Sequence, residues 1–182
     1  LPILIISKCT VKYQFGIKNS EMDDLLTQRL NISPLDSVHS AFIFELVNSP
    51  GWKEFIGERN VNSIQDAEIY IINILANDNI KYHVISIKSK DIPIGIVTFI
   101  KRDYLDHHDI GFAFLPQYSG HGYAHEASKY ILELYKSNHP IILATTKPDN
   151  LKSIKLLEKL GFLYSHDINQ STEDDPLLVY QV

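Results

Sequence analysis

Residues 108–137 constrain the fold of this chain more than any other segment. A strand rich in aromatic residues is predicted over 108–115 and ends at Pro116. The turn Ser119-Gly120-His121-Gly122-Tyr123-Ala124 follows, and an apolar stripe with helical spacing continues from it to about residue 137. A strand, a glycine turn and a helix in this order predict a sheet with a helix packed against it.

Hydrophobic periodicity along the whole chain predicts an α/β (α+β) mixed sheet with flanking helices. Four strands, with two helices between the first and the second, are followed by a helix, a strand, a helix and two closing strands. The predicted strands cover residues 25–34, 81–88, 92–102, 108–115, 141–146, 162–168 and 176–182. The predicted helices cover residues 36–48, 63–77, 124–137 and 150–160.

Short polar signals mark the ends of these helices. Asp36 and Ser63 each precede a predicted helix as N-caps, and Asp66 completes a pattern that resembles a capping box. Ser49-Pro50-Gly51 is predicted to break the chain after the first helix. Gly161 is predicted to end the last helix in the left-handed conformation.

Length and composition limit the classes of function. A chain of 182 residues favours one domain, and a net charge of -5 disfavours general nucleic-acid binding. No apolar run is long enough to span a bilayer, so we expect no membrane partner. The single cysteine, Cys9, excludes an internal disulfide and has no zinc-ligand spacing around it, which favours a reducing, cytoplasmic setting.

The start of the chain suggests a domain boundary. The first residue is Leu1 and the only methionine is Met22. We therefore expect the functional domain to cover residues 22–182 and residues 1–21 to be an N-terminal extension. The alternative is that residues 1–21 contribute an ordinary N-terminal strand, in which case deleting them would abolish folding.

The glycine turn predicts an anion site. The first N–H groups of a helix lack intrahelical acceptors and lie at the positive end of its dipole. Gly120 and Gly122 allow the main chain to approach a ligand closely. Such a turn can hold a diphosphate with main-chain donors and without an obligatory lysine. A plain tight turn is the alternative interpretation of the same residues.

Other motifs built on glycine or histidine do not fit this turn. A P-loop requires Gly-Lys-Ser/Thr after its spacer, and a dinucleotide fingerprint requires a third glycine where this chain has His125. A metalloprotease helix requires glutamate after its first histidine, but Gly122 follows His121. Although His107 and His108 lie nearby in the sequence, we expect no metal site.

The turn resembles the central motif of the GCN5-related N-acetyltransferase (GNAT) superfamily. That motif reads Gln/Arg-x-x-Gly-x-Gly/Ala after a strand, and residues 119–124 match it except at Ser119. His125-Glu126-Ala127, which follows, is similar to the branch of ribosomal-protein alanine N-acetyltransferases and their small-molecule relatives.

A second motif lies one strand downstream. The family pattern of Asn-x-x-Ala/Ser, an apolar stretch and Gly-Phe is matched by Asn150, Ser153 and Gly161-Phe162. Thr27-Gln28-Arg29-Leu30 is similar to the opening strand of the family. The resemblance covers about residues 22–182.

The resemblance implies a GNAT fold with splayed central strands, acetyl-CoA as cosubstrate and no metal. In the family the pantetheine arm lies in the gap between the splayed strands. Asn150 and Ser153 would meet the pantetheine or the thioester, and a helix cap is the alternative role of Asn150, compatible with the first. The remaining implied contacts are Phe112, Ala113 and Phe114 for the pantetheine, and Ser119, Gly120, His121, Gly122, Tyr123 and Ala124 for the diphosphate.

The catalytic residues match the family less closely. Members use a glutamate as base and a tyrosine as acid, but the corresponding positions here hold Thr145 and Leu157. A second family pattern places a base near His108 and Asp109. We hypothesise that His108 or Asp109 deprotonates the acceptor, directly or through water, since imidazole accepts a proton near neutral pH. The alternative is that both residues lie at a solvated strand end.

No tyrosine stands out as the acid. Tyr104, Tyr118, Tyr123 and Tyr135 are phenols that could protonate the thiolate, and packing is the alternative role of each.

The sequence therefore predicts an N-acetyltransferase that moves an acetyl group from acetyl-CoA to a primary amine by direct attack in a ternary complex. The acceptor is either a protein N-terminus or a small amine, chosen by residues 36–80 and the loop 101–106. The first alternative is a non-catalytic acyl-CoA-binding module. The second is a nucleotide-binding α/β protein, based on the glycine turn alone.

Overall fold

A seven-stranded mixed sheet forms the centre of the computed structural model, which describes residues 27–169 and 176–182. The strand order is β1-β2-β3-β4-β5-β7-β6. Only β4 and β5 pair in parallel, and all the other neighbours are antiparallel. The strands are β1 (Leu30–Pro34), β2 (Ile80–Ile87), β3 (Ile92–Ile100), β4 (Asp109–Phe114), β5 (Leu143–Thr146), β6 (Leu163–Ile168) and β7 (Leu177–Gln181). The predicted mixed sheet is confirmed.

Strands β4 and β5 diverge after a single pair. Asp109 lies opposite Leu143, and the Leu143 N–H donates to the His108 carbonyl at 2.9 Å. Residues 110–114 pair with β3 on one side, and no strand of the described chain pairs with their other side. The splay between the central strands is therefore present, and it leaves one edge of β4 without a partner strand.

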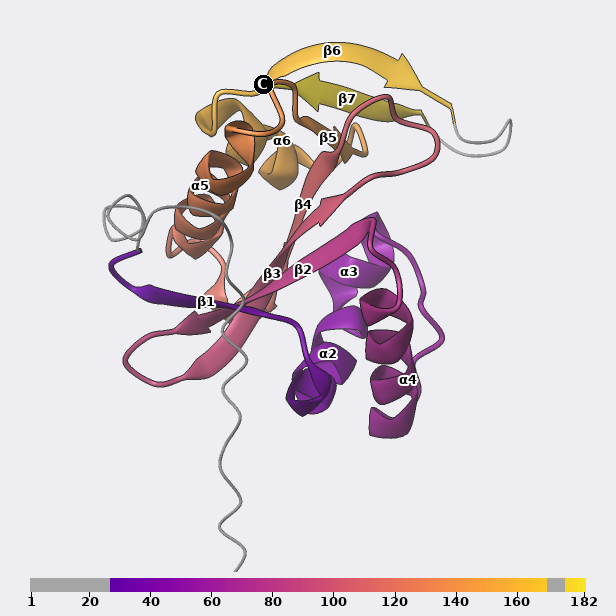
Figure 1. Ribbon diagram of the computed structural model, residues 1–182, viewed down its shortest axis with the longest axis vertical. Coiled ribbons are helices and arrows are strands. Elements are labelled where there is room, and N and C mark those ends of the chain that lie inside the picture. Colours follow the sequence, from indigo (N-terminus) through magenta and orange to yellow (C-terminus); the bar gives the residue numbers. More distant parts are fainter. Residues whose placement is uncertain (1–26, 170–175) are drawn as a thin grey trace, which may run out of the picture.

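Helices cover the two faces of the sheet (Figure 1). Helices α2 (Ser40–Val47), α3 (Pro50–Phe55) and α4 (Ile64–Leu75) share one hydrophobic cluster with the sheet. Helices α5 (Tyr123–Lys136) and α6 (Leu151–Lys159) share another. Short 3-10 turns precede α2 at Ser37–His39 and α5 at Pro116–Tyr118.

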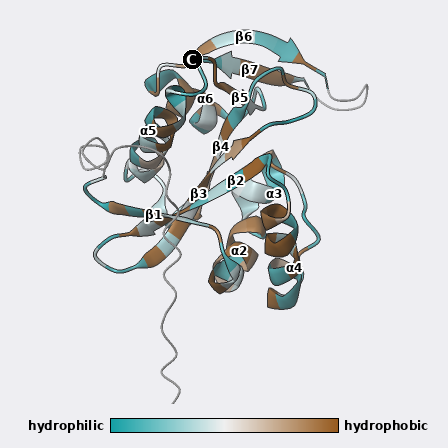
Figure 2. Ribbon diagram, viewed as in Figure 1, coloured by the Kyte–Doolittle hydropathy of each residue, from teal (hydrophilic) through white to brown (hydrophobic). Residues whose placement is uncertain are grey.

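Alternation along the strands assigns side chains to the two faces. On β3, Ile96 packs with α2–α4, and the next residue, Val97, packs with α5. Val84 and Ile85 on β2 divide in the same way. Burial of each such side chain contributes roughly 1.5–3 kcal/mol to folding. In Figure 2 the strands and helices around this centre carry much of the brown, hydrophobic colour, and the loops are largely teal.

The first strand and first helix differ from their predicted bounds. A strand was expected over residues 25–34, but β1 begins at Leu30; residues 25–26 lie outside the described residues. The Thr27 hydroxyl accepts from the Leu30 N–H at 3.1 Å and donates to the Leu30 carbonyl at 2.6 Å. This local turn replaces strand pairing there. The helix expected over 36–48 is a 3-10 turn capped by Asp36, followed by α2.

The segment Ser49-Pro50-Gly51 both breaks and starts a helix. The break after α2 is as predicted, but Pro50 then occupies the first turn of α3, a helix that the sequence did not predict. The fixed φ of proline suits the first helical position, where no N–H is needed. Pro50, which the sequence indicates as a helix break, therefore also begins the next helix.

The other predicted helix ends are confirmed. The Ser63 hydroxyl accepts from the Asp66 N–H at 3.1 Å, as an N-cap does. The Asp66 carboxylate accepts from the Asn62 N–H rather than that of Ser63, and this bond is the largest cause of its lowered pKa. Gly161 adopts φ +89 after α6.

The expected N-terminal extension lies outside the part of the chain that the structure describes, whereas the expectation about membrane spans can be examined in the described part. Residues 1–21 and Met22 lie outside the described residues, so the N-terminal extension stays a prediction. Among the described residues, no helix has the length and apolar character needed to cross a bilayer.

Candidate active site

The turn between β4 and α5 has the conformation that only glycine adopts easily. Gly120 has φ +79 and Gly122 has φ +78, in the left-handed region. A Cβ added at Gly120 would meet no atom within 4 Å. The main chain at Gly120 is therefore open to a ligand, and its glycine is required by backbone conformation rather than by a close protein neighbour.

The main-chain donors of this turn are unused. The Ser119 N–H donates to the Pro116 carbonyl at 3.1 Å, and the next main-chain bond is from the Glu126 N–H to the Gly122 carbonyl at 3.1 Å. Between them, the N–H groups of residues 120–125 find no acceptor in the described chain. Six adjacent donors thus lie at the positive end of a 14-residue helix, an arrangement that suits an anion.

Arg29 links this turn to the start of β1. Its Nε and Nη2 each lie 2.7 Å from Glu126 Oε2, and its main-chain N–H donates to Glu126 Oε1 at 3.0 Å. Its Nη1 donates to the His121 carbonyl at 2.9 Å. The guanidinium carbon lies 4.7 Å from the centre of the Tyr123 ring. The sequence assigned no role to Arg29 or Glu126, although both lie in segments similar to the family.

His121 also takes part in the local structure of the turn. Its Nδ1 lies 2.9 Å from the Ser119 carbonyl, which can only accept, so Nδ1 carries the proton. Its ring stacks on Tyr123 at 5.6 Å between centroids.

The three β4 residues expected to contact pantetheine point to different faces. Phe112 and Phe114 pack toward α5, and Ala113 packs toward α2–α4. All three are half-buried on the strand whose β5-side edge is unpaired. A Cβ at Gly95 would overlap the Phe114 ring, so glycine there allows this ring to lie across β3.

Asn150 and Leu157 have structural roles in α6. Asn150 Oδ1 accepts from the Ser153 N–H at 3.1 Å, so Asn150 is the N-cap of α6, the alternative role expected from the sequence. Leu157 is fully buried in the cluster below α5. Thr145 is half-buried on β5.

The structure places His108 in an aromatic cluster near the C-terminal end of α5. Its ring stacks on Phe99 at 4.8 Å and meets His139 edge-on at 4.4 Å, and Tyr135 stacks on Phe99 at 3.9 Å. Partial burial is the largest cause of the lowered pKa of His108, followed by the charge of His139. Nearby, His83 Nε2 lies 3.0 Å from the Tyr135 hydroxyl.

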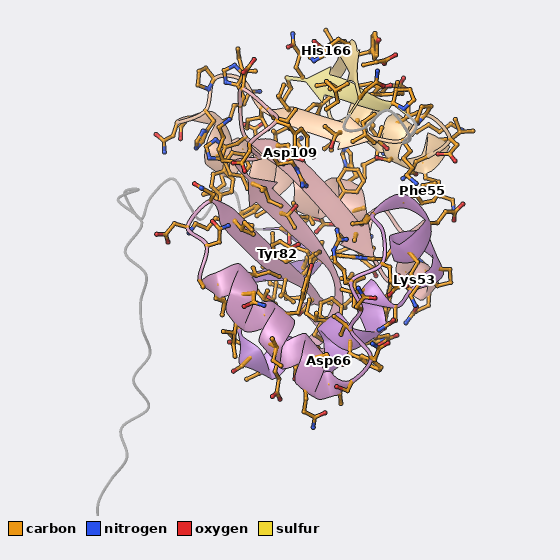
Figure 3. All side chains as sticks on the ribbon, turned by 90° about the vertical axis from the view of Figure 1, so that its right-hand side faces the viewer. Lys53, Phe55, Asp66, Tyr82, Asp109 and His166 are labelled. Atoms are coloured by element: carbon orange, nitrogen blue, oxygen red, sulfur yellow. The ribbon has the colours of Figure 1, made fainter. Side chains whose placement is uncertain are left out.

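Asp109 lies on the opposite face. It is opposite Ile100 on β3, is 2% exposed, and its Oδ1 accepts from Arg102 Nε at 2.9 Å. Burial raises its pKa, and Arg102 partly opposes this rise. Figure 3 looks from the side of α3 and α4 and shows Asp109 and Tyr82 on the central strands. Asp109 is therefore not at a solvated strand end.

The four tyrosines considered as possible acids lie in different parts of the fold. Burial raises the pKa of Tyr135, whose hydroxyl faces His83, and Tyr118 packs against both clusters. Tyr123 lies against Arg29, and Arg102 lies 5.9 Å from the Tyr104 ring. Within residues 27–169 and 176–182, no three His, Cys, Asp or Glu side chains come together as a metal site would require.

Comparisons with known proteins agree with this geometry. The acetyltransferase (GNAT) domain model matches residues 29–163. The uncharacterised N-acetyltransferase YnaD of Bacillus subtilis (strain 168) is 30% identical over 139 residues, which are 75% of this chain and 81% of that protein.

Solved structures share the fold at low sequence identity. A GNAT-family acetyltransferase from Bacillus anthracis has a TM-score of 0.72 at 21% identity, covering 86% of this chain and 96% of that one. Spermidine N-acetyltransferase from Vibrio cholerae, in complex with CoA and spermine, has a TM-score of 0.72 at 17% identity, covering 85% and 95%. Ribosomal-protein-S5-alanine acetyltransferase from Vibrio fischeri has a TM-score of 0.71 at 16% identity, covering 86% and 94%.

The domain match spans most of the chain, and the fold and the donor-rich turn agree with it. The chain thus belongs to the GNAT acetyltransferase family and is an acetyl-CoA-dependent acetyltransferase.

Proposed function

We propose that this enzyme acetylates a primary amine, either a protein N-terminus or a small molecule, by direct attack on acetyl-CoA in a ternary complex. The observation that carries the cofactor half is the run of free N–H groups at residues 120–125. These donors suit a diphosphate, and the left-handed Gly120 leaves room for one. Asn150 and Ser153 lie at the start of α6 and would border the thioester end.

The open edge of β4 supports the path of the pantetheine arm. Residues 110–114 lack a strand partner on the β5 side, so their main-chain groups can bond to the amides of the arm. Phe112 and Phe114 would shield it on the α5 face, and Ala113 leaves space on the other face. When bound, acetyl-CoA supplies the activated acetyl group; the chain supplies position and proton transfer.

The acceptor amine would enter from the α2–α4 face. Helix α5, which begins at the turn that would hold the diphosphate, covers the opposite face of the sheet. Acetyl-CoA bound at that turn would therefore block the approach of an acceptor from the α5 side. Residues 36–80 and the loop 101–106 border the remaining approach and would select the acceptor. Of the two predicted bases, Asp109 has its side chain on this face.

We therefore assign the base to Asp109 rather than to His108. The ammonium form of the acceptor must lose a proton before its nitrogen attacks the thioester carbon, because an ammonium has no lone pair. A carboxylate with a raised pKa is a stronger base than an ordinary one. Since Asp109 is buried, a water molecule would relay the proton.

The leaving thiolate depends less on a catalytic residue than the acceptor amine does. As the new C–N bond forms, the C–S bond breaks and the sulfur takes the electron pair. A thiol has a pKa of about 8.5, so its thiolate is a tolerable leaving group near neutral pH. Once the C–N bond has formed, the nitrogen loses its second proton to solvent to give the amide. Leu157 cannot protonate the thiolate, which can take a proton from solvent.

The compartment of the enzyme and the charge of its acceptor are further proposals. The single cysteine in the sequence supports a reducing compartment, and we propose that the enzyme acts in the cytoplasm. The net charge of -5 supports a cationic or amine-bearing acceptor rather than a nucleic acid.

A panel assay tests the proposed reaction. Thiol release from acetyl-CoA is followed with polyamines, amino acids and peptides with different N-termini, and mass spectrometry identifies the acetylated product. We expect release that depends on one class of primary amine and a mass gain of one acetyl group. Thiol release with no acetylated amine would contradict the proposal, as would stabilisation of the protein by ATP or NAD but not by CoA.

A further inference from the structure

The guanidinium of Arg29 joins three parts of the chain at the glycine turn. It forms a two-nitrogen ion pair with Glu126 in the first turn of α5, and it donates through Nη1 to the His121 carbonyl. The main-chain N–H of Arg29 bonds to the same carboxylate, so the start of β1 is held there as well. The Tyr123 ring lies against the guanidinium and limits its tilt.

The bond to the His121 carbonyl fixes one peptide group of the turn. The described chain contains no cis peptide bond, so the C=O of His121 and the N–H of Gly122 point in opposite directions across one rigid plane. Arg29 approaches from the carbonyl side, and its Nη2 lies 3.5 Å from the position that a Cβ of Gly122 would take. The Gly122 N–H therefore points away from Arg29.

We propose that Arg29 is a positioning residue for acetyl-CoA: by holding the His121 carbonyl, it orients the Gly122 N–H toward the diphosphate. This inference rests on the proposed cofactor site. Gly122, which is left-handed, borders this peptide on its C-terminal side and would otherwise let it rotate, since glycine restricts its own backbone least. A donor oriented in advance costs less to order when the ligand binds.

Arg29 acts through geometry rather than through its charge. Its Nε, Nη1 and Nη2 are already engaged, and the Glu126 carboxylate balances its positive charge. Glu126 holds Arg29 in place, although a carboxylate beside a diphosphate would by itself repel it. Removal of Glu126 therefore distinguishes positioning from charge. If Glu126 positions Arg29, its removal weakens CoA binding; if only its charge matters, the loss of repulsion strengthens CoA binding.

Calorimetric titration with CoA measures this difference. We expect Arg29→Ala and Glu126→Ala each to raise the Kd for CoA by about tenfold, the loss of one oriented, charge-assisted contact. Lys88→Ala is the matched control, because Lys88 is also an exposed cation that holds this segment, through the Thr27 carbonyl at 3.1 Å. It should change the Kd less than about twofold.

Two additional measurements separate positioning from folding and from charge. Arg29→Lys keeps the charge but lacks the planar fork, so it should bind CoA nearly as weakly as Arg29→Ala. In ¹⁵N-labelled protein, the Gly122 amide signal should move on CoA addition in the wild type and in Lys88→Ala, and much less in Arg29→Ala. Thermal unfolding of each free variant shows that it is folded.

The outcomes are distinct. Tighter CoA binding by Glu126→Ala, or full rescue by Arg29→Lys, would overturn positioning in favour of charge. Wild-type binding by Arg29→Ala would overturn the inference and leave the proposed cofactor site intact. Failure of the wild-type protein to bind CoA would overturn both.

Discussion

His108 and Asp109 are adjacent in the sequence but lie on opposite faces of the sheet. His108 stacks on Phe99 on the α5 side, and Asp109 pairs with Arg102 on the side of α2–α4. Alternation along a strand makes this separation unavoidable. An acetyl transfer in the gap beside β4 can therefore use one of these two side chains as its base, while the other side chain lies on the opposite face of the sheet.

The first prediction concerns these two residues. Asp109→Asn should lower kcat by at least about 100-fold, since a positioned general base contributes that much or more. His108→Ala is the neighbouring control and should leave kcat almost unchanged. The pH profile of the wild-type kcat/KM should rise through an apparent pKa above the usual aspartate range, because burial raises the pKa of Asp109. Loss of kcat in His108→Ala but not in Asp109→Asn would reverse the assignment.

A second prediction concerns the left-handed glycine of the turn. Gly120→Ala introduces no steric overlap, yet an alanine at φ +79 costs about 1–2 kcal/mol. We expect lower thermal stability and weaker CoA binding, measured by differential scanning calorimetry and by titration. Gly51→Ala is the control: its site is equally open but lies in α3, where alanine should stabilise the protein by about 0.5–1 kcal/mol. Equal effects of the two substitutions would contradict the role of backbone conformation.

The third prediction is a dependence of stability on pH. Burial lowers the pKa of His83 to about 4, below its value of 6.5 in the absence of such burial. Between these values the unfolded chain binds a proton that the folded chain does not, so stability falls as the pH drops from about 6.5 to about 4. The loss is on the order of 3 kcal/mol at most.

Urea unfolding at several pH values measures this loss. His83→Gln should flatten the slope in that pH range, whereas His166→Gln, which changes an exposed histidine of β6, should retain it. An unchanged slope in His83→Gln would show that other groups cause the acid sensitivity.

A fourth prediction compares two leucines of α6. Leu157 is fully buried and Leu151 is 62% exposed. Leu157→Ala should destabilise the protein by about 2–5 kcal/mol because it leaves a cavity, whereas Leu151→Ala should cost under about 0.5 kcal/mol. Chemical denaturation measures both. Similar small losses would mean that Leu157 is not a core residue.

The sequence predicted the mixed sheet and the glycine turn because both depend on local patterns, whereas the splay was expected only from the resemblance to the family. Apolar runs indicated the strands at 81–88 and 92–102, and the glycines at 120 and 122 indicated the turn. The start of β1 was not predictable from apolar content, because the Thr27 hydroxyl replaces strand bonds there.

The contacts of the site depend on residues far apart in the chain. Arg29 and Glu126 are 97 residues apart, and no local pattern indicates that they meet. The sequence left His108 and Asp109 as alternative bases, because the burial of Asp109 and the stacking of His108 arise from tertiary packing. Alternation along a strand separates adjacent side chains onto opposite faces, but it does not indicate their neighbours.

A crystal structure of the protein with CoA tests the central claim most directly. We predict that diphosphate oxygens lie about 2.7–3.2 Å from main-chain nitrogens of residues 120–125, including Gly122, with the pantetheine along the unpaired edge of β4. A diphosphate bound elsewhere, with these N–H groups facing solvent, would contradict it.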